Sequence, residues 1–212
     1  IGQRSCNIPP SSRTHDGGAI LKPVNEPMRL EDVHELLRSA SKLTNHRNFV
    51  IVGSLSSIGS LVSPPDSMVC SRDIDLYLKQ DPGRAFIEVA QHLAEGSEFH
   101  AQHGFYADPV SPSLISAPEN WENRLVPITF QDGLVAWFMD LTDAACSKLI
   151  RGQSNDRIWV ESGLRDGALD AETLRERLGR CARALDGEVE RARSLLVQII
   201  NGDRTTSRVK DI

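Results

Sequence analysis

The chain has 212 residues, of which 40% are hydrophobic and 25% are charged, and this composition is typical of a globular protein. Its formal net charge of -5, without a long block of either sign, argues against a dedicated reader of duplex DNA but is compatible with an enzyme that acts on RNA. No apolar run approaches the roughly 20 residues that span a bilayer, so we expect no membrane segment.

Cysteine usage points to a reducing compartment. Four cysteines are scattered along the chain without the spacing of a zinc site: Cys6, Cys70, Cys146 and Cys181. Free thiols in apolar surroundings are the usual interpretation of such residues. The first residues also lack the basic and then apolar pattern of a secretory signal. We therefore expect a cytoplasmic protein.

The first half of the chain alternates irregular, helical and extended patterns. Residues 1–27 are rich in Pro, Gly and Ser without periodicity, which predicts a flexible arm. Apolar residues recur every three or four positions from 30 to 43, which predicts a helix. The sequence NFVIVGS (48–54) predicts a short buried strand that stops at its glycine. A second strand is expected at 73–78 (DIDLYL), and a second helix at 83–96.

The second half begins with short β-rich runs and ends with a helical pattern. Three strands are expected near 103–108, 124–130 and 134–139, and residues 131–133 (QDG) would form the hairpin turn between the last two. From Thr142 to about Gly202 apolar residues follow helical spacing, which predicts either one long last helix or two helices broken at Asp186-Gly187.

These elements predict an α+β protein. A mixed sheet with flanking helices would occupy residues 28–140, and a helical C-terminal part would occupy residues 141–205. Because no linker separates the two parts, we expect them to pack together.

Two carboxylates on the expected strand 73–78 suggest chemistry. Asp73 and Asp75 are two residues apart, so both side chains leave the same face of the strand. Such a pair is costly between apolar neighbours unless a cation neutralises it, and Mg²⁺ binds carboxylates together with substrate phosphates. Gly53-Ser54, after the preceding strand, would offer backbone N–H groups to an anion. The alternative is that Asp73 caps the start of the strand, Asp75 is a charge on an edge strand, and Gly53-Ser54 forms an ordinary turn.

Gly-Ser followed by Asp-x-Asp on a strand resembles the signature of the DNA-polymerase-β-like nucleotidyltransferase superfamily. Three segments further resemble small bacterial nucleotidyltransferase-like proteins akin to the abortive-infection toxins of type IV toxin–antitoxin systems: ELLRSASKLTNHRNFVIVGSLSSIGS, HGFYADPVSPSLISAPENWENRLVPI and DLTDAACSKLIRGQSNDR. The resemblance covers about residues 28–165. It implies a nucleotidyltransferase-type fold, Mg²⁺ held by Asp73 and Asp75, and an NTP bound by Gly53 and Ser54. It also implies transfer of a nucleoside monophosphate to an unknown acceptor, such as RNA or protein, and an antitoxin as partner.

The resemblance implies roles for two further residues. Lys148 stands where the toxin relatives carry a helical lysine, and Asp156 stands at their matching acid. Lys148 would grip the triphosphate or stabilise the leaving pyrophosphate as a compact positive charge. Asp156 would hold a metal, orient Lys148 or act as a base. The alternative is that Lys148 is a solvated helix residue and Asp156 an N-cap of the next helix.

The chain also departs from the superfamily pattern. A third metal carboxylate is not obvious, and the candidates are Asp108, Asp132 and Asp140, the last of which could instead cap the following helix. Gln153 and Asn155 stand where relatives tend to carry basic residues. These departures leave open a catalytically silent nucleotidyltransferase fold that serves as a binding or regulatory module.

The histidines form no convincing metal site. His100 and His103 lie on an expected strand or loop without an acidic partner at ligand spacing. We interpret them, with His34, His46 and His92, as surface or packing residues.

Overall fold

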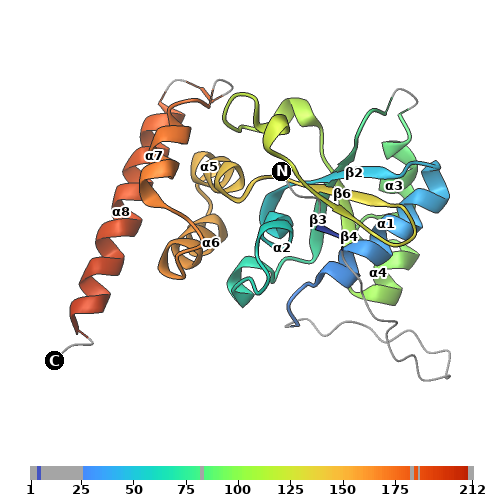
Figure 1. Cartoon of the computed structure of the whole chain (residues 1–212), viewed down its shortest axis with the longest axis horizontal. Helices are drawn as coiled ribbons and strands as arrows, with labels where there is room; N and C mark the ends of the chain where they lie inside the picture. Colours follow the sequence, from blue (N-terminus) through green and yellow to red (C-terminus); the bar gives the residue numbers. More distant parts are fainter. Residues whose placement is uncertain (1–3, 6–25, 82–83, 182–183, 186, 210–212) are drawn as a thin grey trace.

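The computed structural model describes residues 4–5, 26–81, 84–181, 184–185 and 187–209 (Figure 1). Most of the expected N-terminal arm lies outside these residues. Two residues of that arm, Arg4–Ser5, form the short strand β1, which pairs with a strand of the main sheet.

A mixed six-stranded sheet forms the centre of the protein, in the order β1-β5-β6-β2-β3-β4. Its remaining strands are β2 (Asn48–Ile51), β3 (Asp73–Leu78), β4 (Tyr106–Pro109), β5 (Val126–Thr129) and β6 (Val135–Phe138). The pairs β2–β3 and β5–β6 are antiparallel, whereas β1–β5, β2–β6 and β3–β4 are parallel. The predicted α+β class with a mixed sheet is confirmed.

One face of the sheet is covered by helices from the first half of the chain (Figure 1): α1 (Leu30–Thr44), α3 (Phe86–Leu93) and α4 (Glu98–His103). The apolar stripe of α1, including Val33 and Leu37, is buried against Phe49 and Ile74 of the strands. This core is what the helical spacing of residues 30–43 predicts.

The expected helix at 83–96 is shorter than predicted. The Asp81 carboxylate accepts hydrogen bonds from the N–H groups of Ala85 and Phe86, so it satisfies donors at the start of α3. At the other end Ala94 adopts an extended backbone, which terminates the helix.

The expected strand or loop around His100 and His103 is wrong, because both residues lie on α4. The signals of this helix were present in the sequence. The Ser97 hydroxyl accepts a hydrogen bond from the His100 N–H as an N-cap, and Gly104 ends the helix with a left-handed backbone (φ 74°). The strand expected at 103–108 therefore begins only at Tyr106.

Four later helices gather on the other side of the sheet, the last two farthest from it (Figure 1). They are α5 (Leu141–Arg151), α6 (Ser154–Arg165), α7 (Ala171–Leu178) and α8 (Glu188–Val209). Their buried side chains form a second core that also includes Val50 of β2 and Val52, which directly follows β2. The helical part is thus packed directly on the sheet. The short helix α2 (Ser56–Ser60) instead contributes Ile58 to the first core.

The final helical stretch consists of two helices, α7 and α8, as one of the two predicted alternatives requires. Gly187, with φ 85°, directly precedes α8, whereas Asp186 lies outside the described residues. Ala192, Leu196 and Ile199 face the second core from α8. No helix in the described part of the chain is both long and apolar enough to cross a membrane.

Candidate active site

Asp73 and Asp75 lie on one face of β3, as their spacing predicts. The alternate residues Ile74 and Leu76 are fully buried in the first core, whereas both aspartates remain partly accessible on the opposite face. The Ser71 hydroxyl donates a hydrogen bond to Asp73 Oδ1 and so orients that carboxylate.

The third carboxylate is Asp108, one of the three predicted candidates. It lies on β4 as the registered partner of Asp75 across the parallel strand pair. Carboxylate oxygens of Asp73, Asp75 and Asp108 all lie within 4.8 Å of one another. We call these three residues the acid triad.

The other two candidates serve structural roles elsewhere. Asp132 lies in the β5–β6 turn, before β6, and its carboxylate is 2.9 Å from Nε2 of His34. Because β6 runs parallel to β2, this turn lies at the end of the sheet opposite Gly53. Asp140 is the N-cap of α5, which confirms its alternative prediction, and it also pairs with Arg177.

The acid triad is electrostatically unfavourable in the absence of a cation. Burial, followed by repulsion from Asp73 and Asp108, raises the pKa of Asp75 to about 7 from its ordinary value of 3.8. Burial, followed by the charge of Asp73, also raises the pKa of Asp108. A divalent cation would neutralise this cluster, and oxygen-only ligands suit a hard ion such as Mg²⁺.

Gly53 allows the turn after β2 to contact the acid triad. It has a left-handed backbone (φ 68°) at the start of a 3-10 turn, η1 (Gly53–Leu55). A Cβ atom there would lie 1.9 Å from Oδ2 of Asp75, so no side chain fits without displacing the carboxylate. The backbone N–H of Val52 also donates to the Asp75 carbonyl at 3.0 Å. After Gly53 the chain continues through η1 into the five-residue helix α2.

Lys148 and Asp156 come together beside Ser54. The Lys148 ammonium donates to Ser54 Oγ at 2.9 Å and to Asp156 Oδ1 at 3.1 Å. Both side chains are almost completely buried, with exposed fractions of 4% and 1%. The alternative interpretation of Lys148 as a solvated helix residue is therefore wrong. Gln153 is the N-cap of α6, and Asp156 lies three residues after it. The Asp156 carboxylate accepts a hydrogen bond from the backbone N–H of Gln153, so Asp156 is part of a capping box and is not itself the N-cap.

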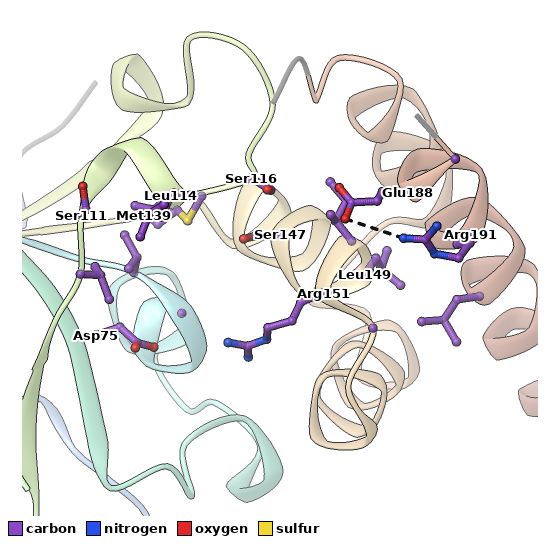
Figure 2. A pocket seen from close by; sticks show the side chains of 18 of the residues that line it. Asp75, Ser111, Leu114, Ser116, Met139, Ser147, Leu149, Arg151, Glu188 and Arg191 are labelled. Carbon is purple, nitrogen blue, oxygen red and sulfur yellow. Dashed lines mark ion pairs between the residues drawn. The ribbon is translucent and has the colours of Figure 1, made fainter. Parts of the chain in front are cut away.

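Arg151 is a site residue that the sequence analysis missed. Its Nε donates to Asp156 Oδ2 at 2.8 Å and its Nη2 donates to Asp156 Oδ1 at 2.6 Å, a bidentate pair. The side chain is 53% exposed and extends from α5 toward Asp75 (Figure 2). A basic residue one helical turn after Lys148 was the available signal.

Trp159 of α6 was also missed, and it ties the helical part to the turn at Ser54. Its indole N–H lies 3.1 Å from the carbonyl oxygens of both Ser54 and Met68. The Lys148 ammonium lies 5.1 Å from the centre of the indole ring system, within the range of a cation–π contact. Packing and hydrogen bonding by Trp159 therefore fix the position of Ser54 relative to Lys148.

A cavity of about 1320 Å³ opens beside the acid triad (Figure 2). Its walls come from Val52 and Gly53 after β2, Asp75 on β3, residues between 109 and 116, the end of α5 and the start of α8. Arg151 projects into its middle, and Glu188 and Arg191 form an ion pair at its far end. Ligand pockets commonly have volumes of about 300–1,000 Å³, so this cavity can take a nucleotide.

Comparison with known proteins gives one match. Neither a curated protein nor a solved structure matches the chain significantly. A family model described as "nucleotidyltransferase of unknown function (DUF6036)" matches residues 28–200, which include every residue of the site described above. The chain therefore belongs to this nucleotidyltransferase family.

Proposed function

We propose that the chain is an Mg²⁺-dependent nucleotidyltransferase that transfers a nucleoside monophosphate from an NTP to an acceptor hydroxyl. The observation that carries this proposal is the acid triad, three carboxylates from two adjacent strands, held against a glycine turn at the mouth of a cavity. Phosphoryl transfer needs this combination of oxygen ligands for cations and a close approach of phosphate to backbone N–H groups.

Asp73, Asp75 and Asp108 would hold the Mg²⁺. The residues fit such an ion, because three carboxylates each offer an oxygen within 4.8 Å of the others. Burial, followed by the charges of Asp73 and Asp108, raises the pKa of Asp75 despite the opposing effect of Arg151 and Lys148, so a bound cation would relieve an unfavourable charge. When bound, Mg²⁺ neutralises the charge that develops on the phosphate oxygens.

The chain's own residues would position both reactants. Gly53 and Ser54 would bind phosphate oxygens, with the Ser54 hydroxyl fixed by Lys148. Asp108, which is exposed on the edge strand β4, would accept the proton of the acceptor hydroxyl. The acceptor oxygen forms a bond to the α-phosphorus, the bond to the bridging oxygen breaks, and pyrophosphate leaves.

The acceptor would be an RNA or a protein, in line with the resemblance to toxin enzymes. That kinship further suggests a cytoplasmic protein controlled by an antitoxin partner. The proposed acceptor and antitoxin partner rest on the resemblance of the segments around Gly53-Ser54 and Lys148 to the toxin enzymes.

A catalytically silent binding module is the second candidate, favoured by Gln153 and Asn155 at positions where the resemblance implies basic residues. A silent descendant is expected to carry an apolar side chain in place of the third carboxylate. Asp108 stands there instead and supports the catalytic candidate.

Incubation with each of the four α-³²P-labelled NTPs and Mg²⁺, with and without cellular RNA, tests the proposal. We expect label transfer to RNA or protein by the natural chain and none by Asp75→Asn. The absence of both nucleotide binding and label transfer with all four NTPs would contradict catalysis. Mg²⁺-dependent binding without transfer to any acceptor would support the silent module.

A further inference from the structure

Two cations share one carboxylate in the candidate site, but they differ in their access to the cavity. Lys148 and Arg151 both donate to Asp156. Arg151 forms part of the cavity wall together with Gly53 and Asp75, whereas Lys148 lies behind that wall with only 4% of its side chain exposed. The resemblance described above implies that Lys148 grips the triphosphate, and its burial conflicts with that role.

The donor groups of Lys148 are directed at the protein. Its ammonium donates to Ser54 Oγ and Asp156 Oδ1 and lies near the indole of Trp159. An ammonium has three N–H donors, and the contacts with Ser54 and Asp156 occupy two of them before any ligand binds. Lys148 is therefore suited to fixing the turn at Ser54 in place.

The guanidinium of Arg151 keeps one edge for a ligand. Its Nε and Nη2 hold Asp156, and Nη1 has no hydrogen-bond partner among the described residues. The side chain points across the cavity toward Asp75 (Figure 2). A planar guanidinium can bind a carboxylate on one edge and a phosphate on another. Because the contact with Asp156 already orders the Arg151 side chain, binding a phosphate would cost that side chain little further conformational entropy.

The acceptor capacity of Asp156 is filled within the protein. Its two oxygens accept from Lys148, from Arg151 twice and from the backbone N–H of Gln153. These contacts leave it little capacity to bind a metal or to remove a proton. Asp156 thus acts as the anchor that aims Arg151.

We propose that Arg151, anchored on Asp156, contacts the terminal phosphates of the NTP, and that Lys148 is a positioning residue for Ser54 and Asp156. This inference rests on the proposed nucleotidyltransferase function. It assigns triphosphate recognition to the end of α5, where the guanidinium reaches into the cavity that also contains Asp75.

Calorimetric titration with the four NTPs and the four matching NMPs, in Mg²⁺, separates the two roles. We expect the natural chain to prefer NTP over NMP. Arg151→Gln should weaken NTP binding by about ten- to a hundredfold and leave NMP binding unchanged, because charge-assisted hydrogen bonds to the terminal phosphates are lost. Arg151→Lys should restore part of the preference. Lys148→Arg and Lys148→Gln should weaken NTP and NMP binding by similar factors, so that the ratio is kept.

Arg157→Gln is the matched control, since Arg157 is partly exposed on α6, pairs with Glu161 and does not line the cavity. It changes the net charge equally and should leave both affinities unaltered. If the natural chain binds NTPs but Arg151→Gln keeps the NTP preference, or Lys148→Gln abolishes it, the inference is wrong while the proposed function stands. If the natural chain binds no NTP, both fail.

Discussion

Asp75 and Asp108 are registered partners on the parallel strands β3 and β4, and their carboxylates converge with that of Asp73. Parallel neighbours cannot be joined by a tight turn, and here α3 and α4 form the crossover between them. The third acid of the triad is thus supplied by a segment that lies far from the Asp-x-Asp pair in sequence and directly beside it in space.

Replacing one acid of the triad should remove nucleotide binding without loss of stability. Asp73→Asn, Asp75→Asn and Asp108→Asn each remove one of three mutually repelling charges, so the metal-free variants should melt at the temperature of the natural chain or above it. Calorimetry should show no Mg²⁺-dependent NTP binding. A marked fall in melting temperature in all three variants would indicate structural carboxylates.

Asp132→Asn is the control for these substitutions. This carboxylate accepts from His34 and from the Leu134 N–H at the opposite end of the sheet. We expect a loss of stability on the order of 1 kcal/mol, because hydrogen bonds to a charged group are lost, with nucleotide affinity unchanged.

The stability of the metal-free protein should depend on the ionisation of Asp75. Its pKa in the folded state is about 7, above the ordinary value of 3.8, so the folded state holds a proton that the unfolded chain has released. Folding stability contributed by this group is present below pH 3.8 and is lost as the pH rises through 7. The Asp75→Asn side chain cannot ionise, so the free energy of unfolding of this variant should exceed that of the natural chain by an amount that grows across that interval to at most about 4 kcal/mol. Urea unfolding at several pH values measures it, and an advantage that does not vary with pH would refute the explanation.

The first two acids could be predicted from sequence because strand alternation is a local property. Asp73 and Asp75 share a face whatever the neighbouring strands are. Asp108 could be named only as one of three candidates, since strand order and register are set by packing of the whole sheet rather than by the residues near it.

The helical side of the site was predictable only in part. The resemblance pointed to Lys148 and Asp156, and the structure brings them together with Ser54. The burial of Lys148 and the reach of Arg151 into the cavity depend on how α5 rotates against β2, and helical periodicity alone does not give that rotation. Helix α4 differs, because the sequence contains its cap residues Ser97 and Gly104, but its six residues are too few to establish a helical period of apolar residues.

Gly53→Ala should lower the stability of the protein by more than its backbone strain alone explains. Gly167 has the same φ of 68° but open space around its missing Cβ, so Gly167→Ala measures the strain by itself, about 1 kcal/mol. Gly53→Ala adds a collision with Asp75 Oδ2 and should cost about 3 kcal/mol and abolish Mg²⁺-dependent NTP binding. Equal losses of stability in the two variants would show that the carboxylate does not rest against the turn.

The α/β core and the helical part should unfold together. Val50 of β2 and Val52, which follows it, belong to the same buried cluster as side chains of α5, α6, α7 and α8, so removing the helices would expose one face of the sheet. Thermal unfolding followed by circular dichroism should show one transition, and a chain ending at residue 140 should not fold cooperatively. Two separate transitions would identify independent domains.

The central claim is that the acid triad holds the divalent cation for nucleotidyl transfer. A crystal structure with Mn²⁺ and a non-hydrolysable α,β-methylene NTP tests it most directly, because anomalous scattering locates the metal. We expect the metal within about 2.0–2.3 Å of carboxylate oxygens of Asp73, Asp75 and Asp108, in line with carboxylate–metal distances in such sites. The α-phosphate should lie beside it and the phosphates along Gly53 and Ser54. Nucleotide bound with no metal at the acid triad, or metal and nucleotide bound at another surface, would contradict the claim.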